Sequence, residues 1–172
     1  MGGTPTPEPS HLRRCLSRFA TGVAVVSYRA EGETCGLTVN SFTSVSLDPP
    51  LVLVSVARSA RAAAHLGRVP FTVNVLSAAQ LDVALHFAGW SRSPATVGWQ
   101  STSDDLAPTL GGALATFRCQ AWHSYDGGDH RLHLGRVVEV SAQAGGEPLV
   151  FDRGTFWDGT GVSISSGAAH AA

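Results

Sequence analysis

Short runs of β-branched and other apolar residues, separated by turn-forming residues, recur along most of this chain. They occupy residues 23–28, 34–39, 51–57, 71–76, 116–125, 130–140 and 148–151, with a loop and short strand over 41–50. Runs of this length predict strands, and the short turns between them favour antiparallel pairing. We therefore expect a mainly β chain whose strands form a closed or nearly closed antiparallel barrel with a few peripheral α-helices.

Two of these runs carry further expectations. Residues 51–57 are nearly all apolar, which is typical of a strand buried on both faces. Along residues 130–140, alternate side chains share a face, so His130 and His133 should point to opposite sides of the sheet. They make a poor metal pair, and the three cysteines are too far apart to suggest zinc or a disulfide framework. No metal site is predicted.

Three short helices are expected beside the strands, over residues 10–20, 59–66 and 77–87. Ser10 and Ser59 can cap the first two, and Ser77 with Gln80 has the form of a capping box that opens the third. Residues 88–112 carry glycines, prolines and two tryptophans and predict a long loop. Long loops inside small domains usually serve function or motion.

Composition bounds the class of protein. The 172 residues predict one domain over 10–160, with flexible ends at 1–9 and 161–172. A net charge of -1 does not favour nucleic acid as a partner. No stretch approaches the roughly 18 consecutive apolar residues of a membrane span, and the start lacks the apolar core of a signal peptide. A cytoplasmic protein is expected.

The sequence contains none of the common catalytic motifs, such as G-x-S-x-G, a P-loop, H-E-x-x-H or G-x-G-x-x-G. It has instead a dense run of hydroxyl and amide side chains from Thr38 to Ser46, between two apolar strands. Each buried polar side chain needs a partner, and a flat heterocycle with several hydrogen-bonding edges would supply them. A Ser/Thr-rich turn that bonds its own backbone is the alternative.

A second candidate is the segment Ala57-Arg58-Ser59-Ala60-Arg61 at the start of the expected second helix. Free N–H groups, the positive end of the helix dipole, a hydroxyl and two guanidinium groups together suit a phosphate. The alternative is a capped surface helix with solvated arginines.

Several motifs together resemble the flavin reductase-like, FMN-binding split-barrel family, which supplies the reductase components of two-component flavin-dependent monooxygenases. The segments that carry the resemblance are 18–26, 38–53, 71–76, 128–137 and 148–154. The resemblance extends over residues from about 12 to 157, with these segments in one order and at ordinary spacings. The resemblance implies an antiparallel, Greek-key-like split barrel.

The family pattern also implies where each part of the cofactor lies. The isoalloxazine ring would lie against residues 38–41 and 44–46, the phosphate against 57–61, and the end of the third helix would border the flavin. His130, in the family's G-D-H motif, would stand beside the nicotinamide and ring N5 as the catalytic candidate. The cofactor-binding candidates are therefore Thr38, Val39, Asn40, Ser41, Ser44, Val45, Ser46, Ala57, Arg58, Ser59, Arg61, Phe87 and Ala88. Residues 89–100 lack the lysine that the family often carries there.

The function implied by the resemblance is an NAD(P)H:flavin oxidoreductase. NADH or NADPH would reduce FMN or FAD by hydride transfer, and the reduced flavin would pass to a partner monooxygenase. A homodimer is also implied, in keeping with 44% hydrophobic and 15% charged residues, which suggest an apolar patch to cover. The alternative is a flavin-binding electron carrier or sensor of the same fold without multiple turnover.

Overall fold

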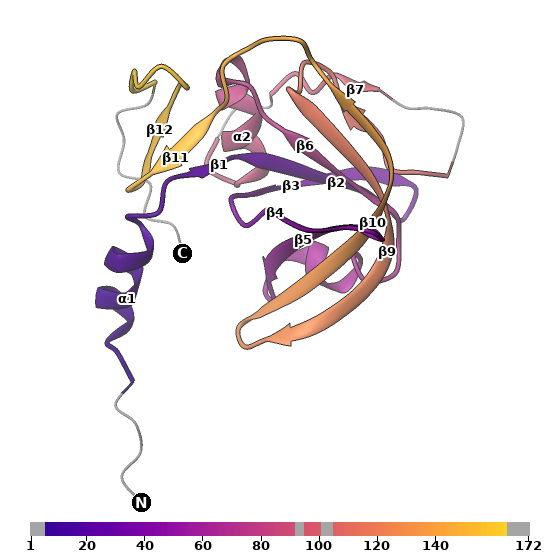
Figure 1. Cartoon of the computed structure of the whole chain (residues 1–172), viewed down its shortest axis with the longest axis horizontal. Coiled ribbons are helices and arrows are strands. Elements are labelled where there is room, and N and C mark those ends of the chain that lie inside the picture. The colour runs from indigo at the N-terminus through magenta and orange to yellow at the C-terminus, as the bar shows by residue number, and fades with distance from the viewer. Residues whose placement is uncertain (1–5, 92–94, 101–104, 165–172) are drawn as a thin grey trace, which may run out of the picture.

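The central feature of the computed structural model is a seven-stranded antiparallel sheet with the order β3-β2-β6-β9-β10-β5-β4 (Figure 1). The structure describes residues 6–91, 95–100 and 105–164. The strands of this sheet are β2 (Ala24–Ala30), β3 (Glu33–Val39), β4 (Thr43–Leu47), β5 (Pro50–Ala57), β6 (Phe71–Val75), β9 (Ala115–Gly127) and β10 (His130–Ala142). The expectation of a mainly β, antiparallel fold is confirmed.

Smaller elements flank this sheet. Strands β1 (Thr21–Gly22), β11 (Val150–Asp152) and β12 (Thr155–Trp157) form a separate three-stranded sheet. Strands β7 (Trp99–Gln100) and β8 (Thr109–Leu110) pair within the expected long loop. The helices are α1 (Pro9–Leu16), α2 (Leu81–Phe87) and the 3-10 turns η1 (Arg61–Ala64) and η2 (Ala78–Gln80). None of the described helices is long and apolar enough to cross a membrane.

Two tight turns set the register of the long hairpins. Glu31 and Gly32, at φ 54° and 83°, connect β2 to β3 with Ala30 opposite Glu33. Gly128 and Asp129 connect β9 to β10 with Gly127 opposite His130, and Gly128 has φ 76°. Two-residue turns of positive φ match the twist of antiparallel strands. The second turn makes His130 the first residue of β10.

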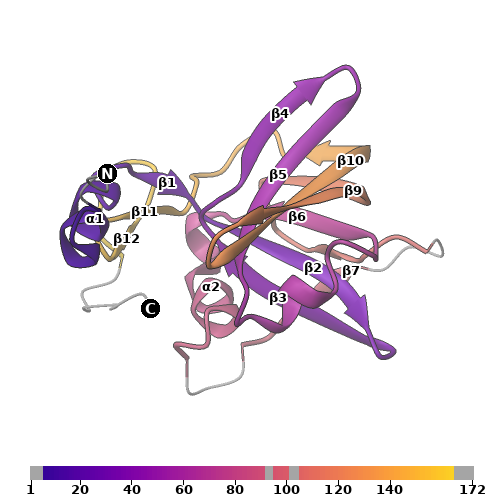
Figure 2. The ribbon, with the colours of Figure 1, turned by 90° about the horizontal axis from the view of Figure 1, so that it is seen from below.

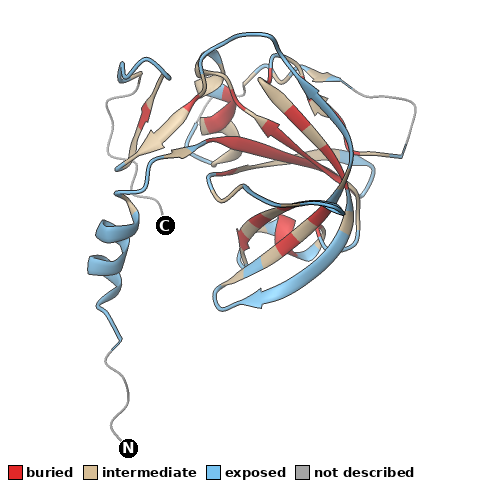
Figure 3. Cartoon of the chain, viewed as in Figure 1, coloured by how far each residue is buried: buried red, intermediate tan, exposed pale blue. Residues whose placement is uncertain are grey.

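Burial shows which strand is covered on both faces. In β5, Val52, Val54 and Val56 are buried while Leu53 is half-buried, so the expectation of burial on both faces is wrong there. The physical reason is position, because the β4–β5 hairpin projects from the body of the molecule (Figure 2). Strand β2, between β3 and β6, is instead buried almost throughout (Figure 3).

Alternate residues of β2 supply two apolar cores. Ala24, Val26 and Tyr28 pack in a core with β5, β6 and β9. Val25, on the other side, and Val23, just before the strand, pack in a second core with α2 and the C-terminal strands. This second core holds α2 and the β11–β12 hairpin close to the end of β3, where the candidate site lies.

The helices depart from expectation at their ends. Helix α1 runs from Pro9 to Leu16 rather than from Ser10 to Ala20, and none of its residues is buried. The expected helix over 59–66 is only the 3-10 turn η1, because Ala60 N donates to Ala57 O and delays the start to Arg61. Ser59 is therefore not its N-cap. The capping box at Ser77 is confirmed, with Ser77 N donating to the Gln80 side chain at 3.1 Å.

Buried polar side chains fix the far end of the long loop to the sheet. Ser27 Oγ donates to Pro108 O at 2.6 Å, and Thr72 Oγ1 donates to Ala107 O at 2.8 Å. Asn74 Oδ1 accepts a hydrogen bond from Leu110 N at 2.8 Å. Hydrogen bonds of this kind satisfy groups that would otherwise be buried without partners. These hydrogen bonds anchor residues 107–110 to strands β2 and β6.

Candidate functional site

A cavity of about 300 Å³ lies where the ends of β3, β5 and β10 meet the end of α2 and the C-terminal hairpin. Its volume is at the lower end of the range for small-molecule sites. Seven of the residues predicted from the sequence line it: Thr38, Val39, Asn40, Ser41, Ala57, Ala88 and His130. Four segments that are far apart in the chain are thereby brought to one place.

Other predicted residues lie outside the cavity wall. Ser44, Val45 and Ser46 are in β4, on the projecting hairpin, where a register irregularity separates Ser44 from Ser46 (Figure 2). Phe87 faces the second core and packs against Trp99, with ring centroids 5.6 Å apart. None of these four residues lines the cavity.

The hydroxyl groups of the Thr38–Ser41 segment already have protein partners. Thr38 Oγ1 donates to Ala84 O at 2.8 Å, which fastens β3 to α2. Ser41 Oγ donates to Ser55 O at 2.8 Å and accepts from Ser55 N at 3.0 Å, which fastens the segment to β5. These two hydroxyls therefore do not need a ligand as partner, contrary to the reasoning from the sequence. They hold the segment in place, so its backbone and the exposed Asn40 side chain are what it offers a ligand.

The two arginines of the predicted phosphate segment are paired with carboxylates. Arg58 forms an ion pair with Asp126, and its Nε donates to Gly128 O at 2.7 Å, which ties the segment to the β9–β10 turn. Arg61 pairs with Glu31 at 3.0 Å. The Gly128 N–H bond and the Arg58 charge hold the pKa of Asp126 below its usual value. Because η1 has only four residues, a helix dipole contributes little. Arg58, Ser59 and Arg61 lie outside the cavity wall, and binding of a phosphate by the two guanidinium groups stays a prediction.

His130 is the first residue of β10, opposite Ala57 in the β5–β10 register, and lines the cavity. Its Nδ1 is 2.7 Å from Asp129 Oδ1. The hydrogen bond to His130, followed by the charge of that ring, lowers the pKa of Asp129. With Nδ1 engaged in this way, Nε2 is the ring nitrogen available to a ligand.

An aromatic part of the wall was not among the predicted site residues. Trp90, Phe151 and Phe156 line the cavity on the side of α2 and the C-terminal hairpin. Trp90 could be seen in the sequence only as part of a long loop. The two phenylalanines could not be placed because β12 is three residues long and its pairing with β11 depends on a turn at Arg153-Gly154.

His133 lies away from the cavity, as its register predicted. It is 1% exposed, and its Nδ1 is 2.8 Å from Ser124 Oγ. Among the described atoms, its buried Nε2 has no hydrogen-bond partner. Burial, and secondarily the charge of Arg131, lower the pKa of His133 below its ordinary value of 6.5. His133 is therefore a neutral core residue at neutral pH.

This burial predicts a pH dependence of stability. Below its ordinary pKa of 6.5 the imidazole takes up a proton in the unfolded chain, which the folded chain resists. The free energy of unfolding should therefore be lower at about pH 5.5 than at about pH 7.5, with the loss developing as pH falls from 6.5 toward the folded pKa. Urea titrations at both pH values measure it.

The His133→Gln variant should lose part of this pH dependence, whereas His123→Gln, at an exposed position of β9, should keep it. An unchanged difference between the two pH values in the His133 variant would contradict the assignment.

A second cavity adjoins the first. It has a volume of about 460 Å³ and lies between residues 19–24 and residues 40–43. Val23, Asn40 and Ser41 border both cavities. Within the described residues, no group of three or more His, Cys, Asp or Glu side chains is placed to hold a metal ion.

Comparison with known proteins identifies the family. The family model described as flavin reductase like domain matches residues 16–160, a span that includes every residue lining the cavity. The chain belongs to the flavin reductase family. Its fold is accordingly the split barrel that the sequence resemblance implied. Of the segment 38–53 that carries this resemblance, residues 38–41 line the cavity.

Similar flavin reductases come from several bacteria. The chain is 42% identical over 151 residues to an NADH-dependent FAD reductase of Streptomyces globisporus, covering 84% of this chain and 82% of that protein. It is 40% identical over 146 residues to an FMN reductase (NADH) of Agrobacterium fabrum, covering 84% and 83%.

Solved flavin reductases share the architecture. The structure of flavin reductase PheA2 superposes with a TM-score of 0.83 at 32% identity, covering 88% of this chain and 98% of that one. An NADH:FAD oxidoreductase of Streptomyces globisporus, solved with NAD and FAD fragments, gives a TM-score of 0.79 at 36% identity, covering 98% of this chain and 100% of that one.

Proposed function

We propose that this flavin reductase uses NADH or NADPH to reduce FMN or FAD at the cavity between residues 38–41, Ala57, Ala60 and His130. The observation that carries the proposal is the position of the family signature, because Thr38–Ser41 lines the cavity that four distant segments enclose. The cavity wall combines apolar side chains with a polar strand end. A flat, partly apolar cofactor with hydrogen-bonding edges fits that wall.

The flavin, when bound, supplies the hydride-accepting chemistry. The protein's task is then to position two planar rings and to keep water out. Thr38 and Ser41 prepare the site, because their hydroxyl bonds to α2 and β5 fix the segment before any ligand arrives. Val56, Phe151 and Phe156 supply apolar wall. No catalytic acid or nucleophile is required, in keeping with the absence of such motifs from the sequence.

We further propose that the reduced flavin passes to a partner monooxygenase. A relative from Thermus thermophilus, 40% identical over 148 residues, is the reductase component of a 4-hydroxyphenylacetate 3-monooxygenase. Transfer requires the flavin to leave, and the cavity suits this because few charged side chains border it. We also propose that the enzyme acts in the cytoplasm, since its reaction consumes NADH or NADPH. The competing function is an electron carrier or sensor that keeps its flavin.

A turnover assay separates these functions. Purified protein at nanomolar concentration is mixed with NADH, or NADPH, and a large excess of free FMN or FAD, and loss of the nicotinamide absorbance is followed. We expect many nicotinamides to be oxidised per protein. Oxidation that stops after one equivalent, with flavin retained by the protein on gel filtration, would favour the carrier.

We expect His130→Ala to lower kcat or to raise the KM for NADH by about tenfold, the scale of one lost interaction. Flavin affinity should change little, because His130 is one of many residues around the cavity. Steady-state kinetics and a separate flavin titration measure the two effects.

His123→Ala is the matched control, since His133 is a core residue whose loss would disturb folding. A His130 variant with normal turnover would show that His130 does not assist hydride transfer or nicotinamide docking.

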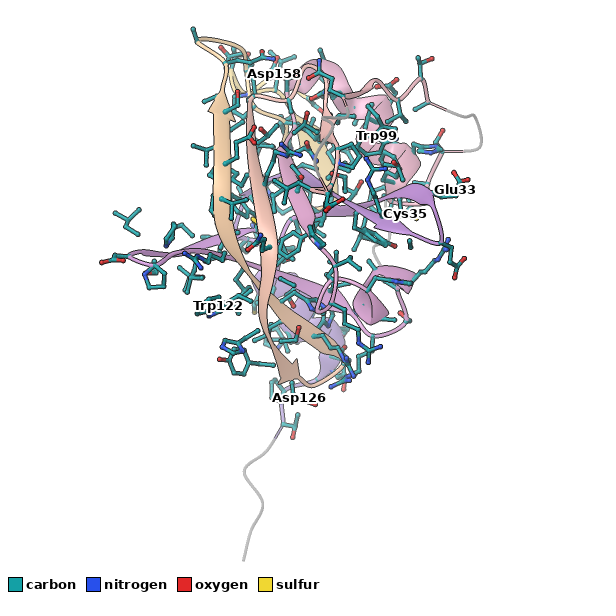
Figure 4. All side chains as sticks on the ribbon, turned by 90° about the vertical axis from the view of Figure 1, so that its right-hand side faces the viewer. Glu33, Cys35, Trp99, Trp122, Asp126 and Asp158 are labelled. Atoms are coloured by element: carbon teal, nitrogen blue, oxygen red, sulfur yellow. The ribbon has the colours of Figure 1, made fainter. Side chains whose placement is uncertain are left out.

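We also propose a homodimer. Large apolar side chains are exposed on the outer part of β9 and β10, namely Trp122, Tyr125, Val138 and Val140. Figure 4 shows Trp122 on the side of this hairpin away from Cys35 and Trp99. Light scattering at micromolar concentration should give twice the 17.9 kDa of one chain. A mass of one chain would contradict the dimer.

A further inference from the structure

Trp90 is held in a fixed position by the way α2 ends. Gly89 adopts φ 73°, and its N–H donates to His86 O at 3.0 Å, while Trp90 N donates to Leu85 O at 2.9 Å. This pair of hydrogen bonds is the Schellman motif, in which glycine takes the left-handed position that other residues adopt at a cost. The backbone of Trp90 is therefore directed by the helix end, despite its place at the start of a long loop.

Two phenylalanines from the C-terminal hairpin support the indole. The ring centroid of Trp90 is 6.0 Å from that of Phe156 and 6.4 Å from that of Phe151. The phenylalanines form a directly opposed pair across β11 and β12, with centroids 5.1 Å apart. Tilted and edge-on packing at these distances is favourable for aromatic rings. The three rings form one aromatic shelf in the cavity wall.

The indole nevertheless remains partly uncovered. Trp90 is 39% exposed, although it lines the cavity and is backed by two buried or half-buried rings. In Figure 1, α2 and the β11–β12 hairpin lie in the upper part of the molecule, and the β9–β10 turn lies at its lower end. The cavity is lined from both, by Trp90, Phe151 and Phe156 and by His130, the first residue of β10. A rigid indole that is fixed at its back and free toward a cavity is a surface on which a planar ring can pack.

We propose that Trp90 is a binding residue of this flavin reductase whose indole packs against an electron-poor heteroaromatic ring, that of the flavin or of the nicotinamide. Nothing in the family signature assigns this role, because Trp90 lies in the stretch 89–100 that departs from it. The proposal rests on the proposed function for its ligands. The binding measurements below do not depend on turnover, so the two can fail separately.

The test compares Trp90→Ala and Trp90→Phe with the wild type and with Trp122→Phe, which changes an equally exposed tryptophan outside the cavity and keeps an apolar ring in the proposed dimer surface. Each protein is titrated with FMN alone and with NAD⁺ alone. Trp90→Ala should raise the dissociation constant of one of the two by about tenfold, as expected for a lost stacking contact. Trp90→Phe should recover most of the affinity, and Trp122→Phe should bind as the wild type does.

The ligand whose dissociation constant rises in Trp90→Ala is the one whose ring packs against the indole. A spectroscopic measurement separates packing on the ring from a structural role: the ligand should quench tryptophan fluorescence in the wild type and in Trp122→Phe, and much less in Trp90→Phe. Unchanged affinity for both ligands in Trp90→Ala would overturn the proposal. Loss of affinity with no recovery in Trp90→Phe, or quenching equal to wild type in that variant, would overturn it as well.

Discussion

Replacing Gly135 by valine should destabilise the fold by about 3 kcal/mol or more, because overpacking a rigid core costs roughly 1–3 kcal/mol even for smaller additions. Gly135 lies in β10 between β5 and β9. A Cβ atom built there would lie 2.5 Å from Phe71 Cζ and 2.7 Å from Cys119 Cβ. Both neighbours are fully buried, so neither can move aside without disturbing the first core. Urea denaturation measures the change through the midpoint at constant slope.

Gly145→Val is the matched control. A Cβ at Gly145 meets no described atom within 4 Å, and its φ is not in the left-handed range. This variant should unfold at nearly the same urea concentration as the wild type. Equal midpoints for the two variants would show that Gly135 is not packed as closely against Phe71 and Cys119 as the structure has it.

The second large effect is a loss of affinity for the phosphate group of FMN. The Arg58→Gln, Arg61→Gln double variant should weaken FMN by tenfold or more, since charge-assisted hydrogen bonds are worth about 1.5–3 kcal/mol each. Riboflavin, which carries no phosphate, should lose far less. The carboxylates of Asp126 and Glu31 pair with these arginines in the structure and would compete with the phosphate.

Fluorescence titration with both flavins measures the difference. Arg153→Gln is the control, because Arg153 also pairs with a carboxylate, that of Asp152, but lies in the turn between β11 and β12 and not in the predicted phosphate segment. An equal loss of FMN and riboflavin affinity in the double variant would show that the phosphate lies elsewhere.

The strands and hairpins of the main sheet could be predicted because their signals are local. The Val-rich run of β2, the polar turn at Glu31-Gly32 and the Gly128-Asp129 turn each determine their own short stretch of chain. The burial of β5 could not be predicted in the same way. Its apolar sequence does not reveal that β4 and β5 form a hairpin that projects from the body of the molecule and leaves alternate residues of β5 only half-buried (Figure 2).

The candidate site was predicted in outline for a similar reason. The resemblance placed Thr38–Ser41, Ala57, Ala88 and His130, and the structure brings them to one cavity. The partners of the Thr38 and Ser41 hydroxyls could not be inferred, because Ala84 and Ser55 meet them only through tertiary packing. The aromatic shelf was missed because Trp90 and Phe156 are more than sixty residues apart and share no local pattern.

A crystal structure of the protein with FMN tests the central claim most directly. We predict that the isoalloxazine ring lies in the cavity against the backbone of residues 38–41, with its phosphate beside Arg58 and Arg61 and His130 at the mouth. A flavin bound in the adjoining cavity between residues 19–24 and 42–43, or on the outer face of the β9–β10 hairpin, would contradict the account.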